Sequence, residues 1–142
     1  ALDNLRALLR ELRQQAGEDF AAIIDQSVDV LVSQVREHHT HYAFIARERF
    51  AGPPRVRTAI TEGISLAERE LSIDLAHLPG TRSWSEADLR VLSTLIVGAM
   101  VSTVERLLAV EPGSDSERGI TASTRTQVRM LLVGAVNWRS DA

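Results

Sequence analysis

The chain has 142 residues, of which 44% are apolar and 25% charged, a composition typical of one globular domain and not of a disordered tail. It contains no cysteine, which excludes disulfides, thiol nucleophiles, thiolate zinc sites and iron–sulfur clusters. Its formal net charge is −3 and it has no basic tail, which argues against direct contact with nucleic acid.

No apolar run approaches the roughly 20 residues that a membrane-spanning helix needs. The N-terminal residues show no charged-then-apolar signal pattern. We therefore expect a cytoplasmic protein that does not insert into a membrane.

The first third of the chain carries three predicted helices. Leucines recur at helical spacing over residues 2–16, with Arg6 and Arg13 expected on the opposite, polar face. An apolar stripe then predicts a helix over residues 20–38. A shorter amphipathic helix is predicted over residues 40–51, where a glycine and two prolines end it.

Three longer helices are predicted in the rest of the chain. Apolar residues step by three or four over residues 55–78, as far as a Pro-Gly pair. Ser85 is a suitable N-cap for a helix over residues 85–110. After a Pro-Gly turn, the last helix covers residues 117–138 or begins at Ile120. No segment is convincing as a strand, so the predicted fold is all-α, an antiparallel bundle of about six helices.

The last two predicted helices are apolar on more than one face. A helix that is buried on one side needs a single apolar stripe, so two broad stripes indicate a second contact surface. We expect an isologous homodimer in which two helices from each subunit form a four-helix packing; the alternative is that both helices are central in a monomer. The residues expected at this interface include small ones that allow close approach: Leu95, Gly98, Ala99, Ser102, Leu131, Gly134, Ala135 and Trp138.

No pattern typical of an enzyme occurs in the chain. It lacks a Gly-x-Ser-x-Gly elbow, a phosphate-binding glycine-rich loop and an H-E-x-x-H motif, and Glu68 and Glu70 diverge on a helix. The run EHHTH at residues 37–41 has the spacing of metal ligands, but it lies between two predicted helices. A solvent-exposed helix end is therefore favoured over a metal site. We expect no catalytic residue, no metal and no cofactor.

A cationic stretch lies between the third and fourth predicted helices. Residues 47–57 contain four arginines, among them Arg47 and Arg49, and one glutamate. Four large apolar residues lie in or beside it: Tyr42, Phe44, Ile45 and Phe50. An apolar lining with cations at one rim suits an amphiphilic acid. The alternative is a solvent-exposed helix–turn junction whose arginines pair with nearby acids.

Three segments in register resemble the C-terminal regulatory domain of TetR-family transcriptional repressors. They are YAFIARER at residues 42–49 followed by Gly52, WSEA at 84–87, and QVRM at 127–130 with Gly134, Ala135 and Trp138. Within the family, they are most similar to the repressors of unsaturated fatty-acid synthesis, of the FabR and DesT type. The first 40 residues match only as a helical pattern.

The resemblance implies a homodimer that binds a long-chain acyl-CoA and binds operator DNA through an N-terminal helix-turn-helix domain. No helix-turn-helix sequence precedes Leu2. Residues 1–16 would then be the distal part of a helix linking to a missing DNA-binding domain, and residues 17–142 the ligand-binding and dimerisation domain. An alternative of another class is a helical homodimerisation or adaptor module without a small-molecule ligand.

The resemblance also implies which residues contact the ligand. Those expected to line the cavity are Phe44, Ile45 and Phe50, with Val28, Leu31, Ile64 and Leu71 opposite. Arg47 and Arg49 match the family's motif, and two roles stay open for them: they hold the acidic head of the ligand, or they brace the missing domain.

Overall fold

The computed structural model describes residues 2–15 and 20–140. Its helices are α1 (Leu2–Gln15), α2 (Phe20–Glu37), α3 (His39–Ala51), α4 (Pro54–Ala76), the 3₁₀ turn η1 (Pro79–Thr81), α5 (Glu86–Leu108) and α6 (Asp115–Val136). The described residues contain no strand, so the predicted all-α fold of about six helices is confirmed. The domain boundary expected between residues 16 and 17 lies outside the described residues.

Serine side chains fix the start of the last two helices. The Ser85 hydroxyl accepts a hydrogen bond from the backbone N–H of Asp88, which confirms Ser85 as the N-cap of α5. Ser114 accepts from the N–H of Glu117 in the same way, so α6 begins earlier than predicted. Gly113, with φ of 78°, supplies the left-handed conformation that closes the preceding turn.

Each of α4, α5 and α6 ends two residues before its predicted end. The residues that follow each helix donate hydrogen bonds to the carbonyl three positions earlier, as Leu78 does to Leu75 at 3.1 Å and Val110 to Leu107 at 3.3 Å. The chain therefore continues through a tighter 3₁₀-type turn, which preserves the apolar spacing that defined the predicted helix.

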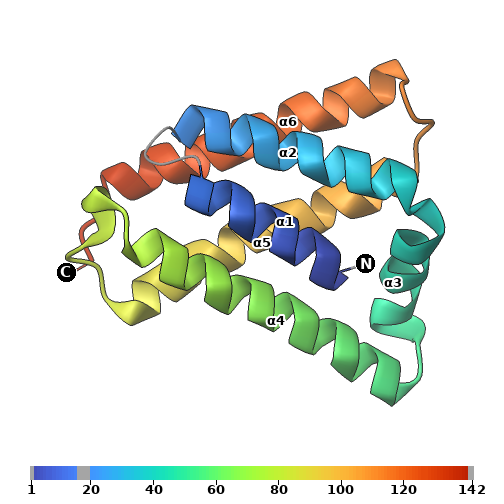
Figure 1. The fold of residues 1–142 in the computed structure, drawn as a ribbon, viewed down its shortest axis with the longest axis horizontal. Helices are drawn as coiled ribbons and strands as arrows, with labels where there is room; N and C mark the ends of the chain where they lie inside the picture. Colours follow the sequence, from blue (N-terminus) through green and yellow to red (C-terminus); the bar gives the residue numbers. More distant parts are fainter. Residues whose placement is uncertain (1, 16–19, 141–142) are drawn as a thin grey trace.

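The helices form a bundle in which α1 lies between two longer helices. Figure 1 shows α1 between α2 and α4. α3, which connects α2 to α4 in the chain, lies across one end of the bundle. α4 packs on α5, α5 packs on α6, and α2 packs on both α5 and α6. Gly52 allows the sharp turn from α3 into α4, because a Cβ atom there would lie 2.7 Å from the carbonyl oxygen of Glu48.

Two groups of buried side chains make up the core. The first joins α1, α2, α3 and α5 around Val28, Leu31 and Tyr42. The second joins α4 and α5 around Leu71 and Leu92. Members of both groups line one cavity, which therefore lies between them.

Candidate ligand-binding cavity

An elongated cavity of about 500 Å³ runs through the bundle, and all six α-helices contribute to its wall. Its volume is within the roughly 300–1,000 Å³ typical of small-molecule sites. The lining residues of α1 run from Leu2 to Gln14, a length of about 18 Å at roughly 1.5 Å per residue. The cavity therefore has the dimensions of an extended, unbranched chain.

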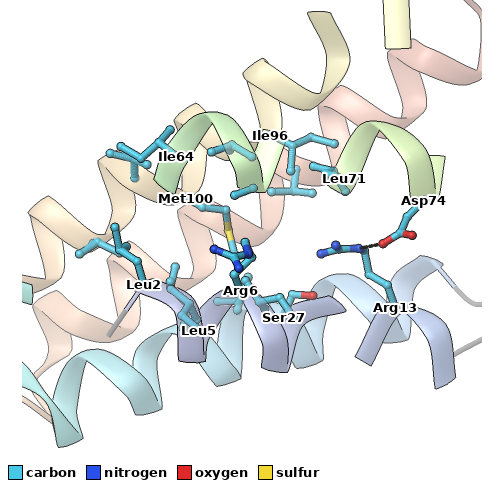
Figure 2. A pocket seen from close by; sticks show the side chains of 18 of the residues that line it. Leu2, Leu5, Arg6, Arg13, Ser27, Ile64, Leu71, Asp74, Ile96 and Met100 are labelled. Atoms are coloured by element: carbon cyan, nitrogen blue, oxygen red, sulfur yellow. Dashed lines mark hydrogen bonds and ion pairs between the residues drawn. The ribbon is translucent and has the colours of Figure 1, made fainter. Parts of the chain in front are cut away.

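Aliphatic side chains form most of the wall. Figure 2 shows Leu2 and Leu5 of α1 on one side of the pocket, and Ile64, Leu71 and Ile96 on the other. α2 and α6 complete the wall with Ile24, Val28, Leu31, Val128 and Leu132. A ligand methylene buried against such a wall gains about 0.8 kcal/mol.

Three ion pairs interrupt this apolar wall. They join α3 to α5 and α1 to α4 at nitrogen–oxygen distances of 2.9, 3.0 and 2.8 Å: Arg49–Glu105, Arg6–Glu70 and Arg13–Asp74. The first lies at the α3 end of the cavity, and Figure 2 shows the Arg13–Asp74 pair at the opposite end with Arg6 between. Each cavity arginine thus faces a carboxylate.

The positions of Arg6 and Arg13 correct the expectation that both lie on a polar face of the first helix. Both line the cavity. α1 is packed between α2 and α4, so the surface that it buries is wider than its leucine stripe. The spacing 2, 6, 9 and 13 follows one face of a helix, and this was the signal in the sequence that places both arginines beside the leucines.

The structure brings six of the predicted ligand-binding residues together around the cavity: Val28, Leu31, Ile45, Arg49, Ile64 and Leu71. It places Phe44, Phe50 and Arg47 outside, where Phe44 is 45% and Phe50 70% exposed. The expectation that these two aromatic residues line the cavity is therefore corrected. α3 turns positions 42, 45, 46 and 49 toward the cavity, and positions 44, 47 and 50 fall on its other face.

Tyr42, which the sequence marks as an apolar neighbour of the arginines but not as a ligand contact, also lines the cavity. It is buried among α1, α2 and α5 side chains, and this burial raises the pKa of its phenol above the ordinary value of 10.0. α5 adds further lining residues that were not predicted, among them Ile96 and Met100. They were missed because a helix that is apolar on several faces does not reveal which face meets the cavity.

Seven of the eight predicted dimer residues lie on α5 and α6, and Trp138 follows the end of α6 at Val136. Exposed among them are Leu95, Gly98, Ser102, Gly134 and Trp138, whereas Ala99, Leu131 and Ala135 are partly buried. Further large apolar residues on the same two helices are also exposed: Val91, Met130, Val133 and Val136. We call the exposed members of these two sets the α5/α6 face.

Trp138, at the edge of the α5/α6 face, fixes the C-terminal end of the chain to the start of α5. Its indole Nε1 donates a hydrogen bond to Asp88 Oδ2 at 3.0 Å, and the backbone N–H of Ser85 donates to Ser140 Oγ at 2.7 Å. Hydrogen bonds from Trp138 and, to a smaller extent, Ser140 hold the pKa of the Asp88 carboxyl below its ordinary value.

A second hollow, polar in character, lies between α2 and α6. Arg36 forms an ion pair with the buried Glu117, and Arg125 pairs with Asp25 and Asp29. Because these charges neutralise one another, the hollow is a seam that fixes α2 on α6.

The histidine-rich run is at the junction of α2 and α3. The rings of His38 and His41 stack with centroids 5.9 Å apart. Within residues 2–15 and 20–140, no three or more His, Cys, Asp or Glu side chains are grouped so that they could hold a metal ion.

α5 is the one helix in the described part of the chain that is long and apolar enough to cross a membrane, by length and composition only. This is weak support for a span, because the core helix of a soluble protein meets the same criterion. Only 22% of its apolar window is buried inside the structure. α5 therefore carries more apolar surface than this chain covers.

No protein-family model matches the sequence, and no curated protein is significantly similar to it. An all-α bundle does not by itself identify a TetR-type domain. The cavity and the α5/α6 face are the features of this structure that bear on its function.

Proposed function

We propose that the chain is the effector-sensing domain of a TetR-family transcriptional repressor, which binds a long-chain acyl-CoA or fatty acid and controls genes of lipid metabolism. The observation that carries the proposal is the elongated aliphatic cavity of about 500 Å³. An extended C16 chain is on the order of 20 Å long, and the lining of α1 alone runs for about 18 Å. The resemblance of three sequence segments to this family supplies the regulatory context.

The aliphatic wall favours long chains over short ones. Each methylene that leaves water for this wall adds about 0.8 kcal/mol, so the eight additional methylenes of a C16 chain relative to C8 add about 6 kcal/mol at full burial. That free energy corresponds to an affinity ratio of more than a thousand. The affinity of such a cavity for an acyl chain therefore depends strongly on the length of the chain.

α3 is the element through which an occupied cavity would act on a DNA-binding domain. One face of α3 lines the cavity through Tyr42, Ile45 and Arg49, and the other exposes Phe44 and Arg47. Because Arg47 points away from the cavity, we assign it to the domain contact and not to the ligand. A ligand shifts the equilibrium between two states only through its differential affinity for them. α3 could transmit such a shift, because one of its faces lines the cavity and the other is exposed.

The proposed protein is a homodimer through the α5/α6 face. Val91, Leu95, Val133 and Val136 on these two helices are large apolar residues, and each is more than half exposed. A second copy of the same face covers such a surface in an isologous four-helix packing. Operator DNA would be bound only through a helix-turn-helix domain that this sequence does not contain.

The α5/α6 face also favours a second candidate function, a helical homodimerisation or adaptor module that has no small ligand. Native mass spectrometry of the purified chain distinguishes the two. The sensing role predicts a dimer that carries a co-purified lipid and that takes up palmitate or palmitoyl-CoA after delipidation. A folded dimer that binds neither compound contradicts the sensing role and supports the adaptor.

A further inference from the structure

Polar side chains gather at the end of the cavity that is farthest from α3. Arg13 and Gln14 of α1 and Asp74 and His77 at the end of α4 line it. Three of these four side chains can donate a hydrogen bond: a guanidinium, an amide and an imidazole. Figure 2 shows the Arg13 and Asp74 side chains meeting there, beyond the aliphatic residues. The cavity is therefore an apolar channel that ends in hydrogen-bond donors.

Asp74 occupies an electrostatically unfavourable position. It lies in the last turn of α4, which ends at Ala76 and has no basic residue in that turn. The helix dipole places partial negative charge at this end, so a carboxylate there is disfavoured unless a cation offsets it. Arg13 Nε provides that cation at 2.8 Å from Asp74 Oδ2. A ligand carboxylate that bound Arg13 would take from Asp74 the cation that offsets its position, so Asp74 competes with the ligand for Arg13.

The Arg13 end is a better place for an acidic head than the Arg49 end. The Arg13 and Asp74 side chains are 18% and 22% exposed, whereas Arg49 and Glu105 are 29% and 43% exposed. Ion pairs lose strength with exposure because water screens them. The Arg49 guanidinium also lies over the Phe50 ring, 4.7 Å from its centroid. A charged head gains most from the less solvated guanidinium.

We propose that the cavity takes its ligand as a free long-chain carboxylic acid, whose carboxylate replaces that of Asp74 as the partner of Arg13. This rests on the proposed function and selects between its two ligand forms. One guanidinium with one exchangeable carboxylate matches a head with a single negative charge. The several phosphate charges of coenzyme A would bring more negative charge beside Asp74 than a single carboxylate does, and they would need a cluster of cations. Gln14 and His77 donate to the second oxygen of the bound carboxylate.

Calorimetric titration of the delipidated protein with palmitate, methyl palmitate and palmitoyl-CoA tests the proposal. The variants are Arg13→Gln, Asp74→Asn and, as the matched control at the other end, Arg49→Gln. We expect Arg13→Gln to lower the affinity for palmitate about 10- to 100-fold, because a charge-assisted hydrogen bond is lost. The affinity for methyl palmitate should change less than about twofold, because its ester carries no charge that Arg13 could pair with. Asp74→Asn should raise the affinity for palmitate several-fold, because it removes the carboxylate that competes for Arg13.

The higher palmitate affinity expected for Asp74→Asn distinguishes a head-group site from a purely structural ion pair. If the pair were only structural, Arg13→Gln and Asp74→Asn would both weaken it and neither would raise the affinity for palmitate. Asp74→Asn also keeps the proposal testable if Arg13→Gln does not fold, as judged by thermal unfolding. Equal losses for palmitate and its ester, a loss confined to Arg49→Gln, or tighter binding of palmitoyl-CoA than of palmitate to the unsubstituted protein each overturn the proposal. Failure of all three compounds to bind overturns the proposed function together with it.

Discussion

The hydroxyl oxygens of Thr103 and Thr124 lie 2.6 Å apart between α5 and α6, and both residues are 0% exposed. Each hydroxyl is also within hydrogen-bond distance of a carbonyl of its own helix, that of Ala99 at 2.7 Å and that of Ile120 at 3.0 Å. One hydroxyl therefore donates to the hydroxyl of the other helix, and the second hydroxyl donates to a carbonyl of its own helix. This contact fixes the relative position of the two helices that carry the α5/α6 face and part of the cavity wall.

Substitution of Thr103 or Thr124 by valine should lower the free energy of unfolding by about 1 kcal/mol each, because one buried hydroxyl loses its partner. The double substitution should cost less than the sum of the single ones, since it leaves no unpaired hydroxyl. Urea denaturation of the four proteins gives the coupling. Strict additivity would show that the two hydroxyls do not interact.

Tyr42 should titrate above the ordinary tyrosine pKa of 10.0, because burial disfavours its phenolate. Above about pH 10 the unfolded chain loses this proton while the folded chain keeps it. The free energy of unfolding should therefore fall as the pH rises from about 10 through the folded-state pKa, and the contribution of Tyr42 is complete below that range. The chain has one tyrosine, so tyrosinate absorbance reports it alone.

The native absorbance midpoint should lie above 10 and return to about 10 in concentrated urea. Tyr42→Phe should remove the part of the pH dependence that is due to this group. A native midpoint at or below 10 would show that Tyr42 is solvated in solution.

Gly134→Leu should dissociate the proposed dimer without unfolding the subunit. A Cβ atom at Gly134 meets nothing within 4 Å in the protomer, so the added side chain projects into the α5/α6 face. Overpacking of a close helix contact costs on the order of 1–3 kcal/mol. Sedimentation at micromolar concentration should show folded monomer for Gly134→Leu and dimer for the control Gly80→Leu, another glycine with free space. If Gly134→Leu and Gly80→Leu are both dimers, the interface does not lie at the α5/α6 face.

Ala67→Phe should shorten the chain that the cavity accepts, because Ala67 lines the cavity from α4. The added ring fills part of the space along which a long chain lies. Affinity for C16 should fall at least about tenfold, while C8 should stay within about twofold, since each excluded methylene forfeits about 0.8 kcal/mol. Ala59→Phe, an exposed position on the same helix, is the matched control. Equal losses for C8 and C16 would indicate general destabilisation.

The helices were predictable from sequence because their signals are local. Ser85 caps α5 as expected, and the glycine and prolines after residue 51 separate α3 from α4. The end of α4 was placed two residues too late because the apolar spacing continues through Leu78 in a 3₁₀ turn. Periodicity records which residues are apolar at helical spacing and not which backbone hydrogen bond is made.

The site was predictable only in part because lining a cavity is a tertiary property. Ile64 and Leu71, which the resemblance implies as lining residues, do line the cavity. Phe44 and Phe50, implied in the same way, lie on the exposed face of α3, because a resemblance of sequence segments does not define which face of a helix meets the cavity. The leucine stripe puts Arg13 on the opposite, polar face of the first helix, whereas the packing of α1 between two helices brings it to the cavity.

The central claim is that the cavity holds a long acyl chain, and calorimetric titration of the delipidated, dimeric protein with C8, C12, C16 and C18 ligands tests it most directly. Both the free acids and the acyl-CoA thioesters should be measured. We expect affinity to rise steeply from C8 to about C16, where the channel ends, and then to level. Equal affinity across the series, or no binding by folded protein, would contradict the claim and leave the adaptor function in its place.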